Sequence, residues 1–487
     1  MLRPAARLLA ICAALLALSG CASQYFRAAG APAEAPRYSL ATLPDKDIWT
    51  GVVFNGNKIG FTHTRVASAG EHRWAIEGEA VMHFHVLGYD KRVEAQTLDL
   101  VDDDARLIGF DYRYLLDESR QRIKGTLREG RLEWELSDAA GRTLERREIP
   151  VSGTLYPAGA LDILPVLQGL RVGAEFHWQV FNGETQQVDE AAQRIESYET
   201  SELFAGPAFK LRTDMLGMGS TTWLDARGRP VFELAMNGVM ISALEDETTA
   251  RGYLAAAALN RNDVILEWSL VKAPLALSDP RKASYLRIIL PGAERAPLSD
   301  ERQRCRREAA DVVCDIDATR PAAPGPADEA LKPSAVVTSN DPKIRELARS
   351  LVSPQAPARA KVTAILAWID ANIAPEAVDA FSARDVLDAR RGECQGHAWL
   401  YAALARALGV PTRVVNGLVY APEYGGFLYH TWAESLIDGE WRAVDPTFRQ
   451  LPADATHIAL GRGESMADLA SLVEWMGKTR IRVLEAR

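Results

Sequence analysis

Short segments in which apolar and polar residues alternate fill the N-terminal half of the chain, from about residue 46 to 260. Alternation of this kind gives a strand one buried face and one exposed face. Turn sequences such as NGN, DDD and REG separate at least seven segments: WTGVVF, KIGFTHTRV, RWAIEGEAVMHFHV, RVEAQTLDLV, RLIGFDYRYL, RLEWELS and FHWQVF. Many short strands at close spacing favour an antiparallel sheet, built as a sandwich or an open barrel. We therefore expect an all-β antiparallel domain over residues 46–260, with one helical interruption near residues 158–170.

The pattern becomes helical after a proline-rich stretch, RPAAPGPADEALKPSA, which we interpret as a linker over residues 319–340. Beyond it, apolar residues recur on one helix face at Val362, Ile365, Leu366, Ile369 and Ile373. Ser382 and Asp385 have the spacing of a capping box, which predicts that another helix begins there. The sequence thus predicts a C-terminal α+β domain over residues 341–487.

The N-terminus has the features of an export signal. Arg3 and Arg7 precede a short apolar run from Leu8 to Leu18, which is too short to span a bilayer. We expect residues 1–20 to be a signal peptide. The following LSGC resembles the bacterial lipobox, in which the cysteine, here Cys21, is acylated and anchors the protein to a membrane. The alternative is an ordinary signal with a coincidental cysteine.

The resemblance to a lipobox also implies a location. Residue 22 is alanine rather than the aspartate that tends to retain such lipoproteins at the inner membrane. This favours the periplasmic side of the outer membrane in a bacterium with two membranes. Residues 21–45, rich in alanine and proline, then read as a tether between the lipid anchor and the β domain.

Two cysteines lie close together in the segment 261–318, which reads as a small set of further strands. Cys305 and Cys314 stand in RQRCRREAADVVCDIDA, as two short strands around a turn. An exported protein folds in an oxidising compartment, so these two cysteines form a plausible disulfide. The alternative is a pair of unbonded core thiols.

Cys394 is left over, and its surroundings differ. It precedes a helical pattern that Gly409 and Pro411 close, so it lies at or just before a helix N-terminus. Backbone N–H groups without partners at such a position favour a thiolate, the form that attacks carbonyl carbons. This placement is typical of a reactive cysteine.

A base and its partner are available downstream. Apolar and polar residues alternate in YHTWAESLI and in EWRAVDPT, and Asp438-Gly439 separates these two segments. An Asp-Gly pair in this position is a strong signal of a hairpin turn. A two-residue turn pairs residue 437 with residue 440, which places Asp445 on the same face as His430 and one diagonal step from it. A slip of one residue would move Asp445 to the other face. The spacing therefore predicts contact between His430 and Asp445.

GECQGHAWLYAALARALGVPTRVVNG followed by YHTWAESLIDGEWRAVDPTF closely resembles the transglutaminase-like family of papain-related cysteine enzymes, over about residues 340–450. The resemblance implies a papain-like α+β fold. It also implies that Cys394 is the nucleophile, His430 the general base and acid, and Asp445 the residue that orients His430. The implied activity is acyl transfer or hydrolysis at amide bonds of a protein or peptide, through a thioester and without a metal or organic cofactor.

Several alternatives remain at this point. His397 is a rival base, and Cys394 could be an inert core thiol or a disulfide partner. Either an amine or water can attack the thioester. The residues Cys394, His430 and Asp445 alone do not determine whether the enzyme is a transamidase or a hydrolase. A different class of function is a non-catalytic envelope lipoprotein that binds or assembles through its β domain.

Composition excludes other classes of function. The net charge of −9 argues against nucleic acid as a partner, because nucleic acid binds lysines and arginines clustered on one face. His83 and His85 share a strand face but lack a third ligand, so we expect no metal there. Asp102 to Asp104 read as a solvated turn rather than a calcium loop.

Overall fold

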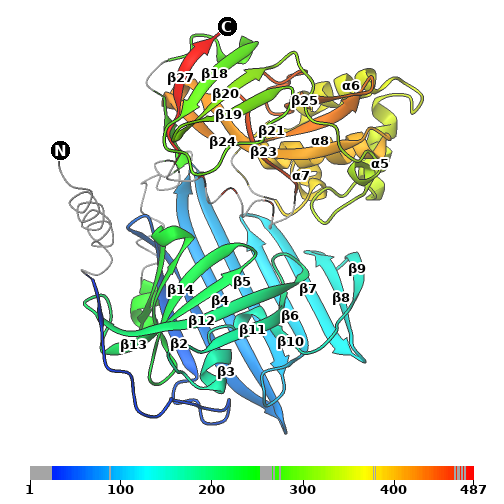
Figure 1. The fold of residues 1–487 in the computed structure, drawn as a ribbon. Helices are drawn as coiled ribbons and strands as arrows, with labels where there is room; N and C mark the ends of the chain where they lie inside the picture. The colour runs from blue at the N-terminus through cyan, green and yellow to red at the C-terminus, as the bar shows by residue number, and fades with distance from the viewer. Residues whose placement is uncertain are drawn as a thin grey trace, which may run out of the picture.

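The two halves of the chain build different architectures, a large curled sheet and a smaller region of sheets and helices (Figure 1). The computed structural model describes residues 25–86, 89–252, 266, 269–273, 276–376, 378, 380–464, 468, 472, 475 and 479–487. The predicted signal and Cys21 lie outside the described residues. Within the described part of the chain, no helix combines the length and apolarity needed to cross a membrane.

The large sheet contains sixteen strands and is antiparallel except for one pair. Its strands are β1 (Phe26–Ala28), β2 (Asp47–Phe54), β3 (Asn57–Gly70), β4 (Arg73–Val86), β5 (Tyr89–Val101), β6 (Leu107–Leu116), β7 (Ser119–Arg128), β8 (Arg131–Asp138), β9 (Thr143–Pro150), β10 (Leu155–Pro157), β11 (Glu175–Asn182), β12 (Gln187–Ser201), β13 (Pro207–Met215), β14 (Met218–Asp225), β15 (Pro230–Ala235) and β16 (Met240–Glu245). Strands β2 to β9 are successive neighbours, as are β11 to β16, and the pairing of β16 with β2 joins the two runs. The parallel pair is β10 with β11.

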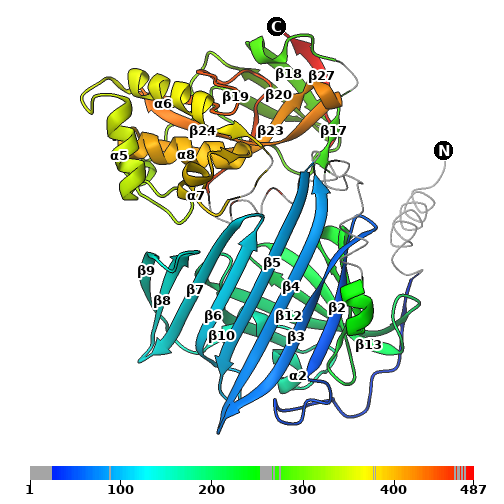
Figure 2. The same ribbon diagram turned by 180° about the vertical axis from the view of Figure 1, so that it is seen from behind.

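The alternation in the sequence explains how this sheet forms a core. In β8, the side chains of Leu132, Trp134 and Leu136 are buried and alternate with more exposed ones. The sheet curls so that its two runs face each other (Figures 1 and 2), and one hydrophobic cluster joins Ile76 of β4 to Trp178 of β11. The predicted antiparallel β domain is confirmed, and the predicted helical interruption corresponds to η2 (Ala158–Ala160) and α2 (Leu164–Gln168).

The described part of the predicted tether, residues 25–45, lies against this sheet. Strand β1 pairs antiparallel with β12, and Leu40 is fully buried. A three-residue strand has too few residues to show alternation, so the sequence pattern does not reveal it. These residues are therefore packed rather than free.

A four-stranded sheet follows, in the order β19 (Gln303–Glu308), β20 (Asp311–Asp317), β18 (Tyr285–Leu290) and β27 (Arg482–Ala486). Cys305 and Cys314 are direct partners across β19 and β20 and form a disulfide, as predicted. The fourth strand comes from the end of the chain. The small sheet is therefore not confined to residues 261–318.

The C-terminal region has a second sheet and a group of helices. The sheet has the order β17 (Val271–Lys272), β24 (Gly426–Ile437), β23 (Thr412–Ala421) and β26 (Ile458–Arg462), with β25 (Glu440–Val444) also paired to β24. The helices are α5 (Pro342–Leu351), α6 (Ala358–Asn372), α7 (Ala383–Ala389) and α8 (Cys394–Ala407), and β21 (Ala374–Pro375) pairs with β22 (Arg391–Gly392) between them. In Figure 2 the helices gather on one side of β23 and β24.

Local sequence accounts for the ends of these helices. The Asp341 carboxylate accepts hydrogen bonds from the first turn of α5, and the Ser382 hydroxyl accepts one from the Asp385 N–H. The Asp385 carboxylate in turn accepts a hydrogen bond from the Ser382 backbone N–H, so the predicted capping box is confirmed. The small sheet packs on this region, because Ile288 and Val483 share one hydrophobic cluster with Leu418.

The predicted linker, residues 319–340, is held to the C-terminal region. It contains η5 (Glu329–Leu331), and Val337 is fully buried. The Ala322 N–H donates to the Trp441 carbonyl at 2.8 Å, and Arg406 donates to the Lys332 carbonyl at 2.7 Å. The segment therefore lies on the C-terminal region instead of spanning open space between two bodies.

Candidate active site

Cys394 is the first residue of α8, and Glu393 before it has an extended backbone. The first N–H groups of a helix have no acceptor within the helix, so they stabilise negative charge at this end. Cys394 is half-buried, and within the described residues it is the free cysteine. The cysteine predicted as nucleophile therefore begins a helix, which is the position expected from the sequence.

His430 and Asp445 come together through the hairpin of β24 and β25. Asp438 and Gly439 form its turn with φ angles of 53° and 83°, a backbone conformation that favours glycine in the second position. The pairs run from Ile437 with Glu440 onward, in the register predicted from the sequence. His430 Nε2 lies 2.7 Å from Asp445 Oδ2, so the predicted contact is present.

The thiol of Cys394 completes a row of three groups. The side chain of Cys394 lies beside that of His430 and acts on the charge of the ring. Because Nε2 of His430 donates to Asp445, the other ring nitrogen, Nδ1, is the one available to the thiol. His430 is 7 % exposed and Asp445 is fully buried, so water is largely excluded from the contact between these two residues.

Burial and charge act in opposite directions on these groups. Burial lowers the pKa of His430, but the charges of Asp445 and Cys394 and hydrogen bonds to both outweigh it and raise that pKa to about 9. Burial favours the neutral form of Asp445, yet the charge of His430 and hydrogen bonds from His430 and His457 hold the Asp445 pKa well below its usual range. The arrangement favours an imidazolium at His430 beside the Asp445 carboxylate.

Both carboxylate oxygens of Asp445 accept hydrogen bonds. Oδ1 accepts the backbone N–H groups of Thr447 and Phe448 at 2.7 and 3.0 Å. Oδ2 is shared by Nε2 of His430 and Nε2 of His457, each at 2.7 Å. His457 is fully buried. The sequence pattern does not indicate its role, because it belongs to no motif and reaches the site only through the pairing of β26 with β23.

His430, Asp445 and His457 together have the composition of a metal site, with ligand atoms within 4.8 Å of one another. Tetrahedral ligands of a zinc ion at about 2.0–2.1 Å would be about 3.3 Å apart. Both nitrogen–oxygen distances here are 2.7 Å, the length of a charge-assisted hydrogen bond. The geometry therefore fits a hydrogen-bonded network better than an ion.

The rival base His397 points elsewhere. Its Nδ1 lies 2.9 Å from the carbonyl oxygen of Glu393, one turn back on the same helix. Burial lowers the pKa of His397, and only weaker effects oppose this. The structure thus favours His430 over His397 as the partner of Cys394.

Aromatic side chains enclose His430. The ring of Phe448 stacks on it, with centroids 5.0 Å apart, and Phe448 is 38 % exposed. Trp432, which is 1 % exposed, lies with its centroid 6.2 Å from His430. Phe448 therefore covers His430 on the solvent side, whereas Trp432 belongs to the core.

The large sheet reaches the segment before the cysteine. Arg391, three residues before Cys394, forms an ion pair with Glu118 in the turn between β6 and β7. This turn lies at the end of the large sheet that faces the C-terminal region (Figure 1). The β domain thus contacts the chain beside the candidate nucleophile.

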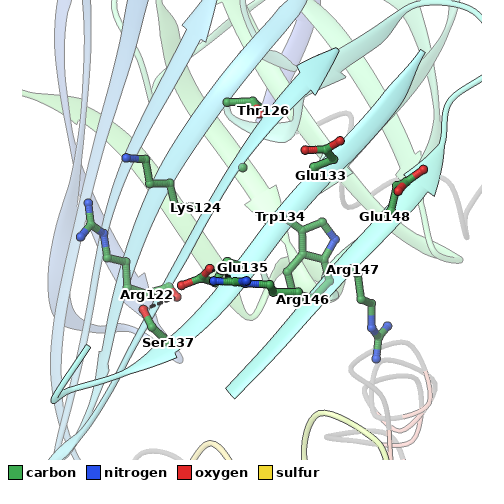
Figure 3. Close-up of a pocket in the computed structure, with 11 residues that line it drawn as sticks. Arg122, Lys124, Thr126, Glu133, Trp134, Glu135, Ser137, Arg146, Arg147 and Glu148 are labelled. Carbon is green, nitrogen blue, oxygen red and sulfur yellow. Dashed lines mark hydrogen bonds and ion pairs between the residues drawn. The ribbon is translucent and has the colours of Figure 1, made fainter. Parts of the chain in front are cut away.

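A separate hollow of about 660 Å³ lies on the large sheet, away from this site (Figure 3). Its walls are strands β7, β8 and β9, and charged side chains of both signs line it together with the ring of Trp134. Glu135 and Arg146, which Figure 3 shows side by side, form an ion pair there with 2.8 Å between nitrogen and oxygen. The described residues that line it include neither cysteine nor histidine.

Comparison with known proteins identifies part of this region. Residues 345–446 match the model of the Transglutaminase-like superfamily, and this segment includes Cys394, His430 and Asp445 but not His457. A search of curated proteins finds no match.

Solved structures that resemble this chain have low sequence identity to it. A proposed cysteine protease from Cytophaga hutchinsonii is 20% identical, with 42% of this chain and 85% of that one covered and a TM-score of 0.30. A β-barrel-like protein of a domain of unknown function from Brucella abortus is 11% identical, with 42% and 97% covered and a TM-score of 0.32. A proposed protease from Parabacteroides distasonis is 11% identical, with 77% and 70% covered and a TM-score of 0.18.

The raised pKa of His430 predicts how its contribution to stability depends on pH. The folded chain holds the proton up to about pH 9, against an ordinary value of 6.5. The stabilisation from the protonated ring is therefore complete below pH 6.5 and is lost as the pH rises through about 9. His430→Gln should lower the urea midpoint strongly at pH 6 and much less at pH 9.5.

Tyr401→Phe is the control for this comparison. It removes a buried hydroxyl that bonds to Ser435 at 2.8 Å, and burial raises the pKa of Tyr401 above the tested range. Its effect on the urea midpoint should be the same at both pH values. A His430→Gln effect that is equally independent of pH would contradict the raised pKa.

Proposed function

We propose that this chain is a cysteine-dependent enzyme that transfers or hydrolyses acyl groups at amide bonds of a protein or peptide. One observation carries the proposal: Cys394 at a helix N-terminus contacts His430, whose other nitrogen is bound to the buried Asp445. A nucleophile, a base and a group that orients the base are the parts that covalent acyl transfer requires. The match of residues 345–446 to the Transglutaminase-like superfamily supports the same reaction class.

In the first half of the reaction, the Cys394 sulfur attacks the carbonyl carbon of an amide. A carbon–sulfur bond forms, and the carbonyl electrons move to oxygen. The oxyanion then collapses, the carbon–nitrogen bond breaks, and His430 gives its proton to the departing amine. A thioester on Cys394 and a neutral His430 remain.

In the second half, water or a primary amine attacks the thioester. His430 takes the proton of the attacking group as the new bond to carbon forms. The carbon–sulfur bond breaks, and the sulfur leaves as a thiolate beside the imidazolium. Asp445 keeps its charge throughout and stabilises the imidazolium, because four hydrogen bonds hold its carboxylate.

We further propose that the mature chain is attached to a membrane through a lipid on Cys21, facing the periplasm from the outer membrane. The support is the sequence alone: the basic N-terminus, the short apolar run, the LSGC ending and the alanine at residue 22. At this location, the substrates available to the enzyme would be proteins or peptides of the cell envelope.

Reactivity of Cys394 is the first test. Wild type should react with iodoacetamide at Cys394 at neutral pH much faster than free cysteine does, and Cys394→Ala should lose this fast labelling. His430→Ala should lower the rate by about 100-fold or more, because the group that stabilises the thiolate is lost. Asp445→Ala should lower it less. A wild-type rate equal to that of free cysteine would contradict the proposal.

The acyl acceptor is tested with a primary amine. Wild type is incubated with a casein substrate and a fluorescent alkyl amine, and both amine incorporation and ammonia or peptide release are measured. A transamidase incorporates the amine, whereas a hydrolase releases product without incorporation. Absence of both reactions in wild type, with Cys394→Ala as the blank, would argue against either activity on this substrate class.

The lipid anchor is tested by expression with labelled palmitate in a bacterium with two membranes. Wild type should carry the label and sediment with outer-membrane vesicles, and Cys21→Ser should be unlabelled. Label on Cys21→Ser, or none on wild type, would contradict the anchor without affecting the proposal for Cys394.

A further inference from the structure

His457 is a buried histidine whose two nitrogens both face acceptors. Its Nε2 lies 2.7 Å from Asp445 Oδ2. Its Nδ1 lies 3.1 Å from the carbonyl oxygen of Asp454 and 3.2 Å from the Asp454 carboxylate. A neutral imidazole has one N–H group only, so two acceptors call for a hydrogen on each nitrogen and a positive charge. The ring is fully buried.

The surroundings hold this ring in place. Arg281 binds the Asp454 carboxylate from the far side, 3.0 Å between nitrogen and oxygen. The buried Arg302 donates to the carbonyl oxygens of Asp454 and His457 at 2.8 and 3.0 Å. The ring edge meets the ring of Trp432, with centroids 5.1 Å apart. Such a tightly packed and hydrogen-bonded ring can fix the direction of its Nε2–H.

The partner of that N–H is the carboxylate of the triad. The backbone holds Asp445 by Oδ1, so rotation about its last bond is limited chiefly by what binds Oδ2. His457 supplies a donor to Oδ2 that does not take part in the chemistry. Without it, His430, the ring that must gain and lose a proton, would be the one remaining donor to Oδ2 among the described residues.

We propose that His457 is a positioning residue of the Cys394–His430–Asp445 site: it fixes the Asp445 carboxylate and, through it, the His430 ring. The inference rests on the proposed function and deepens it. Arg281, Asp454 and His457 all lie outside the family match at residues 345–446, so the site depends on segments before and after that domain.

The charge of His457 also has an effect with a definite sign. The charged groups near it are Asp445, Asp454, His430, Arg281 and Arg302. Its ring centroid lies 5.6 Å from that of His430, so two imidazolium rings repel each other. A neutral residue at 457 removes this repulsion, and the pKa of His430 rises further. The pH at which His430 loses its proton therefore moves upward.

Two amide variants separate positioning from charge. In His457→Gln, the amide can reach the position of Nε2 and donate to Asp445. In His457→Asn, it reaches only the position of Nδ1, toward Asp454. Both are neutral. The measurement is the rate of Cys394 alkylation by iodoacetamide in the full chain, from pH 5 to 10, where two coupled groups give two steps.

We expect His457→Gln to keep a rate close to that of wild type at neutral pH. His457→Asn should lose about ten- to hundredfold, the effect of one hydrogen bond to a charged group. The alkaline step should move to higher pH in both. Tyr401→Phe, which removes a buried hydrogen bond of the same domain, should change neither the rate nor the step.

The outcomes against the inference are distinct. Equal rates and unchanged steps in wild type and both variants would show that His457 does not position the site. An equal loss in both variants, with no movement of the step and no advantage for Gln, would show a purely structural role. In either case a fast wild-type rate leaves the proposed function standing, whereas a wild-type rate no faster than that of free cysteine overturns both.

Discussion

The buried carboxylate of Asp445 is the interaction on which the site depends. A charge without exposed surface is stable in a protein only if hydrogen bonds and opposite charges replace the water it has lost. Two backbone N–H groups and two histidine rings do this here. The same contacts determine where His430 lies, and His430 in turn faces the thiol of Cys394.

Separate parts of the chain supply these contacts. The hairpin brings His430 to Asp445, helix α8 presents Cys394, and His457 immediately precedes strand β26. Arg281 and Arg302 come from before the proline-rich segment and hold the chain around residue 454. The small disulfide-bonded sheet shares its core with the C-terminal sheet, so it supports the site rather than forming an isolated domain.

Features that depend on neighbouring residues could be predicted from the sequence. The Asp438-Gly439 turn determines the hairpin register, and the Ser382 capping box and the helix start at Cys394 follow from a few adjacent positions. Contacts between distant segments could not be predicted. The pairing of β27 with β18 and of β16 with β2 has no local signal, because either strand could join any exposed edge. The role of His457 could not be predicted for the same reason, because it depends on which residues the pairing of β26 with β23 brings near it.

We propose that Cys394 forms a thioester, with His430 and Asp445 supporting the reaction. The most direct measurement is intact-protein mass spectrometry after brief incubation with a small active ester, followed by peptide mapping. We predict one acyl group, located on Cys394, removed by hydroxylamine and absent from Cys394→Ala. No acyl group on wild type under conditions that acylate free cysteine, or an acyl group retained in Cys394→Ala, would contradict the claim.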